Sequence, residues 1–525
     1  MTFNVAEFLD DTAARYPAHT ALIDGAERWN FEQLLGLCNT QAEDLQRLGF
    51  VAGDRVLMLV NNSAQFVSLT FALFKLGAQP ILIDPGMGLK PMLRSIGSIR
   101  PDGLVAIPKG HLVSRLFRQP FQAVKKRAVL GRFPGVPEVA RRARATSFST
   151  LATDPDQTAA LLFTSGSTGP AKAVVYRHRI FQAQVEALQR MYDFEPGEVD
   201  LPGFPLFALF STAMGVTCVI PPLNPSRPAT VDPARMVTAI HAHGVTSLQG
   251  SPAIWSRVGE YCRSRKMPLP TVRRVLTFGA PIATELLRTW KAILPAGAEV
   301  HTPYGATEAL PVTSISGSQA LAAAPSRLAG AGTCVGPAAP NIEIRILPIS
   351  DQAFDSLPDA LPPGEVGEVC VRGPVVTWAY QDQPEATRLA KIESEDGLWH
   401  RMGDLGYLDP EHNLWLVGRK AHRVEWQGQT FFPVAAEGMV NGHPEVARSA
   451  LVAGKSGPTL VVERRPGSRS SDTLLAHECR GLLARHPLYG QVKEVTFHPR
   501  FPVDPRHNAK IHREELSAWA GGRRS

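Results

Sequence analysis

The chain has 525 residues, of which 44% are apolar and 20% are charged. These values are typical of a globular protein with a large core, and they exclude a disordered or collagen-like chain. The net charge of +7 is modest for this length, and no aromatic-rich basic motif accompanies it, so we predict no nucleic-acid binding. A small substrate that carries phosphate accounts for this charge at least as well.

The cysteines and the N-terminal segment indicate a cytoplasmic protein. None of the six cysteines forms a Cys-x-x-Cys pair or lies at zinc-ligand spacing from a histidine, so we expect reduced, mostly buried thiols. The early acidic residues Asp10 and Asp11 argue against a signal peptide. The most apolar long stretch, residues 66–83, contains Lys75, and we interpret it as a helix followed by a strand. We therefore predict that the chain is not an integral membrane protein.

Strands alternate with helices along the first three hundred or so residues. The first unit is a strand at 55–60, a helix over 63–77 with serine at its start and glycine at its end, and a strand at 80–83. The pattern returns with strands at 244–249 and 275–278, each followed by a helix. This alternation favours an α/β fold with a doubly wound, mostly parallel sheet.

Two segments between these units are predicted to be connections. Residues 120–157 and 220–234 are rich in proline, arginine or small residues.

Residues 163–175, with the sequence FTSGSTGPAKAVV, form the most informative stretch of the chain. Backbone N–H groups of such a loop can surround a phosphate, while serine, threonine and Lys172 add donors and charge. The loop lies between apolar segments at 159–163 and 172–176, which we predict to be strands, and this argues against a plain flexible turn. Its glycines and lysine do not have the spacing of a Walker P-loop.

The sequence changes character near residue 365. Residues 365–372 alternate like an antiparallel strand, and 413–417 look like another. The segment that follows has about a hundred residues, which fits a small domain. We predict a large domain over 1–418 and a small domain over 419–525.

Residues 302–308, TPYGATE, follow an apparent strand at Val300. An acid at a strand end beside a glycine turn can hold Mg²⁺, which in turn bridges phosphate oxygens. Taken alone, Glu308 has a commoner explanation as an exposed loop acid.

Two more motifs lie further along the chain. Residues 401–407, RMGDLGY, contain Asp404, whose carboxylate can accept bonds from both hydroxyls of a ribose, and Arg419 follows downstream. Residues 508–513, NAKIHR, contain Lys510. Taken alone, the first motif is also typical of a turn and the second of a solvated basic tail.

Together the four motifs resemble, in order and at matching separations, the core motifs of the adenylate-forming superfamily. That group includes acyl-CoA synthetases, luciferases and the adenylation domains of peptide synthetases. The resemblance covers essentially the whole chain. It implies an α/β fold whose large N-terminal domain has doubly wound, mostly parallel sheets and a distorted β-barrel part, followed by a small mobile α+β domain. It also implies ATP and Mg²⁺ as cofactors.

The resemblance implies a role for each motif. The glycine loop would hold the ATP phosphates, the TPYGATE motif and residues 279–281 would lie around adenine, and Asp404 with Arg419 would hold ribose. Lys510 would bridge carboxylate and phosphate during adenylation. The implied catalytic residues are Lys510, Glu308 and Thr307, and the implied Mg²⁺ ligands are Glu308 and Thr164. The implied nucleotide-binding residues are Thr164, Ser165, Gly166, Ser167, Thr168, Gly169, Lys172, Gly279, Ala280, Pro281, Tyr304, Gly305, Asp404 and Arg419.

Three positions depart from the usual family pattern. The glycine loop ends in PAKA at 170–173 but keeps its lysine. Ala208 stands where the family often has histidine, and Ala421 stands where acyl-CoA synthetases often carry a polar hinge residue. The two alanines leave adenylation possible and put the usual second step, thioester formation with CoA, in doubt.

Residues 175–179, 302–308 and 506–511 most resemble one branch, the β-lactone synthetases of bacterial long-chain olefin biosynthesis. The resemblance implies a long-chain 2-alkyl-3-hydroxyalkanoic acid as substrate. After adenylation, the substrate's own 3-hydroxyl would attack the carbonyl and expel AMP, and proximity favours such an internal nucleophile. The branch also suggests assembly with other olefin-pathway enzymes, namely a thiolase, a reductase and a decarboxylase.

The predicted acyl pocket draws on two apolar stretches, residues 204–214 and 249–255. Two long alkyl branches require a large apolar pocket. His178 is a candidate base for lactone closure, although we favour a structural role for it.

Two other functions stay open. A medium- or long-chain acyl-CoA or acyl-carrier ligase shares the first half-reaction. A non-catalytic scaffold or nucleotide sensor is the second alternative. Retention of Lys172, Glu308, Asp404 and Lys510 together argues against the scaffold, since such a protein has no chemical need for all four.

Overall fold

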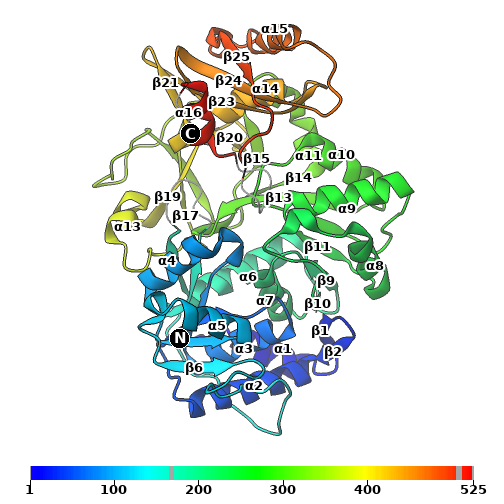
Figure 1. The fold of residues 1–525 in the computed structure, drawn as a ribbon, viewed down its shortest axis with the longest axis vertical. Helices are drawn as coiled ribbons and strands as arrows, with labels where there is room; N and C mark the ends of the chain where they lie inside the picture. The colour runs from blue at the N-terminus through cyan, green and yellow to red at the C-terminus, as the bar shows by residue number, and fades with distance from the viewer. Residues whose placement is uncertain (1, 165–170, 504–510, 523–525) are drawn as a thin grey trace.

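The structure is a computed structural model, which describes residues 2–164, 171–503 and 511–522 (Figure 1). The described chain contains two large, mostly parallel sheets, an antiparallel sheet and a smaller C-terminal unit. Within the described ranges, no helix is both long enough and apolar enough to cross a bilayer.

The first large sheet carries the strand before the glycine loop and the strand after it. Neighbouring strands are parallel except for the last pair, which is antiparallel. In spatial order they are β6 (Lys126–Val129), β5 (Gly103–Ala106), β3 (Arg55–Leu59), β4 (Gln79–Leu82), β7 (Thr158–Phe163) and β8 (Ala173–Arg177). The predicted strands on both sides of the loop are therefore confirmed.

Helix α3 (Ala64–Leu76) connects β3 to β4 and is capped as predicted. The Ser63 hydroxyl accepts a hydrogen bond from the Phe66 N–H, which satisfies a free donor of the first turn. Gly77 ends the helix in the left-handed region at φ 73°, where glycine lacks the Cβ penalty of other residues. The apolar stretch at 66–83 is thus a buried helix and strand.

The second large sheet ends in the hairpin that carries the TPYGATE motif. Its terminal pairs are antiparallel and the pairs between them are parallel. In spatial order its strands are β14 (Ala309–Ser316), β13 (Glu299–Ala306), β12 (Arg274–Thr277), β11 (Ser247–Gly250), β9 (Val199–Pro202), β10 (Thr217–Val219), β1 (Thr20–Asp24) and β2 (Glu27–Asn30).

The strand predicted at 244–249 begins later than expected. Gly244 has φ 60° and caps helix α8 (Pro233–His243), so strand β11 starts only at Ser247. The helices predicted after β11 and β12 are α9 (Pro252–Arg265) and α10 (Thr284–Ile293). The predicted connection at 120–157 also needs correction, because it contains strand β6.

The largest apolar core joins helices to both large sheets. Its helices are α1 (Glu7–Arg15), α2 (Phe31–Arg47), α3, α6 (His178–Tyr192) and α7 (Pro205–Ala213). The core residues Val56 of β3 and Leu22 of β1 belong to different sheets. Buried apolar side chains thereby hold the two sheets in a fixed arrangement.

The third sheet is antiparallel throughout. Its strands are β15 (Thr333–Gly336), β20 (Leu414–Arg419), β19 (Gly397–Leu408), β17 (Gly367–Arg372) and β16 (Glu343–Leu347), with β18 (Lys391–Ser394) paired to β19. The strands predicted at 365–372 and 413–417 correspond to β17 and β20.

The C-terminal unit lies at the top of Figure 1, beyond the antiparallel sheet. Its elements are β21 (Val424–Trp426), β22 (Gln429–Phe431), α14 (Pro433–Val440), β23 (Val446–Gly454), β24 (Gly457–Arg464), α15 (Asp472–Leu483), β25 (Glu494–Phe497) and α16 (Arg513–Ala520). Its core also includes Leu405 and Val417 of the antiparallel sheet. The exact boundary at 418 and 419 stays a prediction; it falls at the end of strand β20.

All six cysteines are free thiols, as predicted. Five are buried and Cys334 is partly exposed. Burial raises the pKa of the Cys262 and Cys479 thiols to about 11, so both are protonated near neutral pH.

Candidate active site

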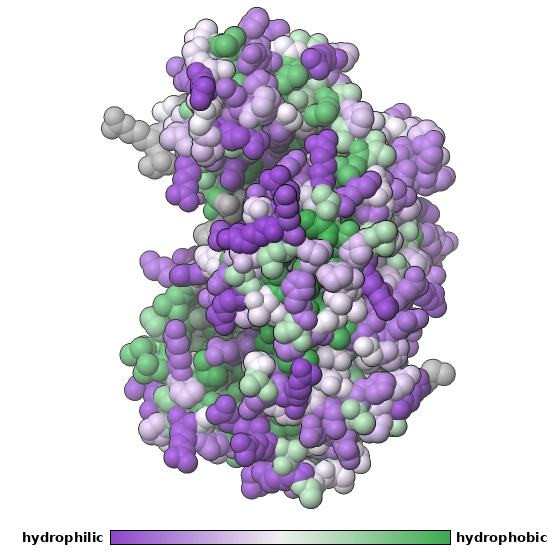
Figure 2. Space-filling view, turned by 90° about the vertical axis from the view of Figure 1, so that its right-hand side faces the viewer, coloured by the Kyte–Doolittle hydropathy of each residue, from purple (hydrophilic) through white to green (hydrophobic). Residues whose placement is uncertain are grey.

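A cavity of about 2080 Å³ opens between the two large sheets, the antiparallel sheet and the C-terminal unit. Figure 2 shows an indentation of the surface between the upper and lower parts of the molecule. The cavity is lined by all the described residues that were predicted to bind nucleotide or Mg²⁺: Thr164, Lys172, Gly279, Ala280, Pro281, Tyr304, Gly305, Thr307, Glu308, Asp404 and Arg419. The other predicted site residues, Ser165, Gly166, Ser167, Thr168, Gly169 and Lys510, lie outside the described residues.

The two ends of the glycine loop are joined by hydrogen bonds. The Thr164 N–H donates to the Lys172 carbonyl at 3.0 Å, and the Lys172 N–H donates to the Thr164 hydroxyl at 3.2 Å. The antiparallel pairing of β7 with β8 continues into these contacts. Thr164 and Lys172 therefore lie side by side on the cavity wall.

Asp404 connects Tyr304 to Arg419 across the cavity. The Tyr304 hydroxyl donates to Asp404 Oδ2 at 2.7 Å, and Arg419 Nε lies 3.1 Å from Asp404 Oδ1. The charge of Asp404 raises the pKa of Arg419, and burial raises the pKa of Tyr304. Asp404 lies within strand β19 and pairs with Arg419 of β20, so the alternative of a simple turn at this motif is wrong.

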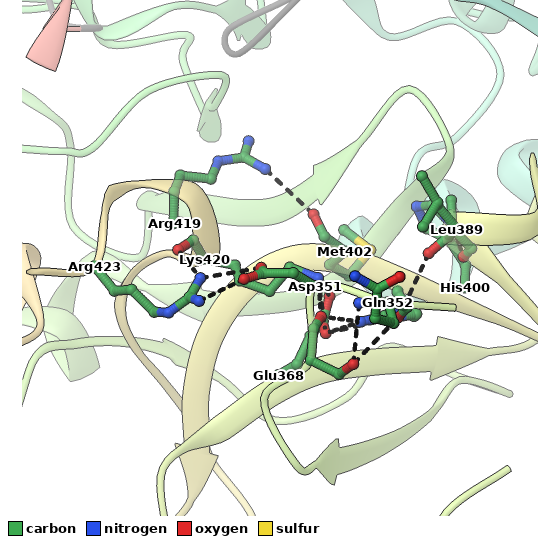
Figure 3. Close-up of polar contacts among 12 residues, drawn as sticks. Asp351, Gln352, Glu368, Leu389, His400, Met402, Arg419, Lys420 and Arg423 are labelled. Atoms are coloured by element: carbon green, nitrogen blue, oxygen red, sulfur yellow. Dashed lines mark hydrogen bonds and ion pairs between the residues drawn. The ribbon is translucent and has the colours of Figure 1, made fainter. Parts of the chain in front are cut away.

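The Arg419 guanidinium also donates to the Met402 carbonyl at 3.2 Å (Figure 3). About 40% of the Arg419 side chain is exposed, so part of its charge faces the cavity. Arginine in this state can donate further hydrogen bonds to a hydroxyl or phosphate.

Glu308 lies in the turn of the β13–β14 hairpin, and its neighbours hold it from two sides. The Tyr380 hydroxyl donates to Glu308 Oε1 at 2.7 Å. The Thr377 N–H and hydroxyl donate to the Glu308 carbonyl at 2.9 and 3.0 Å. The preceding carbonyl, that of Thr307, accepts from the Tyr176 hydroxyl at 2.6 Å. Both the backbone and the carboxylate of the motif are fixed.

The oxygen groups near this turn fit the chemistry of Mg²⁺. A carboxylate and hydroxyls are hard oxygen ligands, and Mg²⁺ commonly takes one or two carboxylates together with phosphates and waters. In the described part of the chain, no group of three or more histidine, cysteine, aspartate or glutamate side chains could hold a metal by itself. A single acid such as Glu308 is compatible with a metal that ATP phosphates also bind.

Gly305 is required by the close packing of the hairpin. A Cβ atom at this position would lie 2.5 Å from the Ala309 carbonyl oxygen and 2.8 Å from a methyl carbon of Leu310. Both distances are shorter than van der Waals contact. The hairpin can therefore close only with glycine here.

Aromatic rings form one wall of the cavity beyond the nucleotide-binding motifs. The ring centroids of Phe207 and Phe278 lie 4.7 Å apart, and those of Phe204 and Phe278 lie 6.0 Å apart. Phe210 and Phe66 also line the cavity. The prediction that residues 204–214 line the pocket is supported for residues 204–207 and Phe210.

The predicted contribution of residues 249–255 is wrong. None of these residues lines the cavity, and Ile254 and Trp255 are fully buried in a different core. The Trp290 indole N–H donates to the Trp255 carbonyl at 3.0 Å, because helices α9 and α10 pack against each other there.

The surroundings of His178 indicate a structural role. It does not line the cavity, and its Nδ1 accepts a hydrogen bond from the Val5 N–H at 3.1 Å. Burial lowers its pKa to about 4. Ala208 is fully buried in the core, whereas Ala421 lines the cavity.

A buried group of charges supports the floor of the site (Figure 3). Glu368 Oε2 lies 2.6 Å from Arg401 Nη2, and Glu368 Oε1 lies 3.0 Å from Lys420 Nζ. Arg401 Nη1 donates to the Gln352 and Leu389 carbonyls at 2.7 and 3.1 Å. These bonds fix the strands that carry Asp404 and Arg419. Sequence patterns did not indicate this group, since its members come from distant segments.

Comparison with known proteins agrees with the resemblance to adenylate-forming enzymes. The family model "AMP-binding enzyme" matches residues 9–381. The chain is 43% identical over 492 residues to the olefin beta-lactone synthetase of Xanthomonas campestris pv. campestris, covering 91% of this chain and 88% of that one. It is 40% identical over 531 residues to the olefin beta-lactone synthetase of Stenotrophomonas maltophilia, covering 97% and 95%.

A solved structure, the amide bond synthetase McbA from Marinactinospora thermotolerans, matches with a TM-score of 0.81 at 22% identity. The match covers 98% of this chain and 100% of that one. It confirms the predicted fold class, including the small C-terminal domain.

Proposed function

Because this chain belongs to the AMP-binding enzyme family, we propose that it activates a 2-alkyl-3-hydroxyalkanoic acid with ATP and closes it to a β-lactone. The observation that carries the proposal is the convergence of Lys172, Tyr304, Glu308, Asp404 and Arg419 on one cavity that also has an aromatic wall. The names of the two relatives at 40 and 43% identity support the choice of product.

The first step joins the acid to AMP. The substrate carboxylate attacks the α-phosphorus of ATP, a P–O bond breaks, and pyrophosphate leaves. Attack of one anion on another is opposed by charge repulsion, so cations around the reacting groups lower the barrier. Lys172, Arg419 and Lys510 are the residues we propose for this role, and a Mg²⁺ held by Glu308 would neutralise phosphate charge when bound.

We propose that the remaining site residues position the nucleotide. Tyr304 and the 279–281 segment would lie against adenine, and Asp404 would accept from the ribose hydroxyls. The N–H groups and hydroxyls of the 164–172 loop would bind phosphate. The bonds of Asp404 to Tyr304 and Arg419 support this division, because they orient the carboxylate on the cavity wall.

The second step needs no other substrate. The 3-hydroxyl oxygen bonds to the activated carbonyl carbon, the bond from that carbon to the AMP phosphate oxygen breaks, and the hydroxyl proton is released. An internal nucleophile has a high effective molarity, which offsets part of the strain of a four-membered ring. Closure would therefore proceed without CoA.

The acyl part of the cavity supports a substrate with long alkyl branches. Phe204, Phe207, Phe210 and Phe278 line it with apolar surface. Such a wall favours alkyl chains over polar groups because burial of each CH₂ contributes about 0.8 kcal/mol. Assembly with other olefin-pathway enzymes stays a prediction, which co-purification with those enzymes would test.

ATP–pyrophosphate exchange with a 2-alkyl-3-hydroxy fatty acid tests the adenylation step. We expect Lys510→Ala to reduce the exchange rate by about a hundredfold or more, since it removes a charge at the reacting phosphate. Lys493→Ala is a matched control, because that lysine is exposed in the C-terminal unit and its ammonium donates to the nearby Gly490 carbonyl. Exchange left intact by Lys510→Ala would contradict the assignment.

A further inference from the structure

Residues 376–381 link the two parts of the site that handle phosphate. Tyr380 forms an antiparallel bridge with Val174 of β8, the strand that follows the glycine loop. At the other end, Val376 forms an antiparallel bridge with Ala309, the residue after Glu308. This segment therefore fixes the position of strand β8, which begins just after Lys172, relative to the Glu308 turn.

The Tyr380 side chain contacts both of these parts. Its hydroxyl donates to Glu308 Oε1 at 2.7 Å, and Lys172 Nζ lies 4.6 Å from the centre of its ring. A lysine over an aromatic face is attracted by the ring quadrupole. Tyr380 is 6% exposed, so both contacts are shielded from water.

The backbone beneath Glu308 is fixed by a second chain of contacts. Thr377 donates twice to the Glu308 carbonyl, and the Lys391 ammonium donates to the Thr377 carbonyl. Lys391 is buried, and burial lowers its pKa to about 7. With the backbone held in this way, the Tyr380 hydroxyl decides how the Glu308 carboxylate is rotated.

We propose that Tyr380 is a positioning residue that presents Glu308 to the metal of the bound metal–ATP complex. Its hydroxyl donates to Oε1, so Oε2 would be the oxygen that Glu308 offers to a bound metal. Without that bond, the carboxylate is free to pair with Arg419, with which it already interacts electrostatically, and such a pair would withdraw Arg419 from phosphate. The inference rests on the proposed function, because it assumes that Glu308 holds the metal.

The test measures metal affinity directly. Mn²⁺ replaces Mg²⁺ as the probe, α,β-methylene-ATP replaces ATP, and electron paramagnetic resonance reports free Mn²⁺. Tyr380→Phe keeps the ring beside Lys172 and removes only the hydroxyl. We expect the affinity of the protein–nucleotide complex for Mn²⁺ to fall about tenfold or more, as for loss of a hydrogen bond to a charged group.

Tyr192→Phe is the matched control. Tyr192 is also buried, and its hydroxyl donates to the Ser314 hydroxyl at 3.0 Å, but it does not line the cavity. We expect this variant to bind Mn²⁺ like the unaltered protein. Equal melting temperatures for the two variants would show that any difference in affinity is not a folding defect.

A double-mutant cycle with Glu308→Ala separates action through Glu308 from action elsewhere. We expect Tyr380→Phe to have little effect on Mn²⁺ affinity once Glu308 is absent. Mn²⁺ affinity of Tyr380→Phe within twofold of the unaltered protein, or additive effects in the cycle, would overturn the inference alone. An unaltered protein that binds no metal–nucleotide would overturn the proposed function as well.

Discussion

Asp404 is the residue that joins Tyr304 to Arg419. Asp404→Asn keeps the size of the side chain but weakens the bonds with the Tyr304 hydroxyl and the Arg419 guanidinium. Hydrogen bonds to charged groups contribute about 1.5–3 kcal/mol each, so we expect the KM for ATP to rise roughly tenfold to a hundredfold. Titration of ATP in the pyrophosphate-exchange assay measures this change.

Asp409→Asn is the control for that variant. Asp409 accepts from the Asn413 N–H at 2.7 Å and the Trp415 indole N–H at 2.8 Å, just beyond the end of β19 and away from the cavity lining. An unchanged KM for ATP in Asp404→Asn, or an equal rise in both variants, would contradict the role given to Asp404.

His178 makes stability depend on pH in a defined direction. Its pKa is about 4 in the folded protein, against an ordinary value of 6.5, so below pH 6.5 the unfolded chain binds a proton that the folded one does not. The free energy of unfolding therefore falls as the pH drops from about 6.5 towards 4. The full contribution of His178 is roughly 3 kcal/mol. Calorimetric melting at pH 7 and pH 5 measures the loss.

His178→Asn removes the titrating ring and keeps an acceptor for the Val5 N–H. We expect the fall in melting temperature between pH 7 and pH 5 to be smaller in this variant. His412→Asn, in an exposed turn with φ 61° that asparagine tolerates, serves as the control and keeps the full pH dependence. A pH dependence unchanged by His178→Asn would disprove the assignment.

Residues inside a motif could be found from the sequence, and residues that act across distant segments could not. Glu308 and Asp404 belong to short patterns with a chemical reason behind each position. Tyr380 follows no such pattern, because its contacts with Glu308 and Lys172 depend on the bridge between Tyr380 and Val174. The Glu368 charge group was missed for the same reason.

Among the elements of the fold, the β13–β14 hairpin depends on Gly305 for its close packing. Gly305→Ala would place a Cβ atom 2.5 Å from the Ala309 carbonyl oxygen, so the two strands must separate to accept it. We expect a lower melting temperature and weaker nucleotide binding, since the hairpin turn carries Thr307 and Glu308. Differential scanning calorimetry and an ATP titration measure the two effects.

Gly481→Ala is the matched control for this substitution. Gly481 lies in helix α15 with no heavy atom within 4 Å of a Cβ built there. Alanine is favoured over glycine in a helix interior by up to about 1 kcal/mol, so this variant should be as stable as the unaltered protein or more stable. Equal stability of Gly305→Ala and Gly481→Ala would refute the packing argument.

Local signals placed the predicted strands and helices in the right segments, but they did not give all the ends or partners of these elements. The Ser63 and Gly77 caps marked helix α3 correctly, because both residues act through nearby backbone groups. The start of β11 was misplaced, because nothing in the residues after Gly244 separates a helix cap from a strand start. Ile254 and Trp255 belong to the core that includes α9 and α10, and composition alone does not distinguish such a core from a ligand pocket.

At the scale of the whole molecule, the cavity depends on an arrangement of three sheets and a small domain. The motif order indicated this arrangement only through the resemblance to adenylate-forming enzymes, since strand alternation predicts one parallel sheet as readily as two. The large core shared by helices and both sheets explains why the motif residues and the aromatic wall line the same cavity. Ala421 lines that cavity at the start of the small domain, where a hinge for CoA chemistry would be expected.

The most direct test of the proposed function is a product analysis by NMR and mass spectrometry. The protein is incubated with Mg-ATP and a synthetic 2-alkyl-3-hydroxy fatty acid, with and without CoA. We predict a β-lactone and AMP in equal amounts whether or not CoA is present. An acyl-CoA thioester formed only when CoA is added, with no lactone, would contradict the proposal and make the enzyme an acyl-CoA ligase.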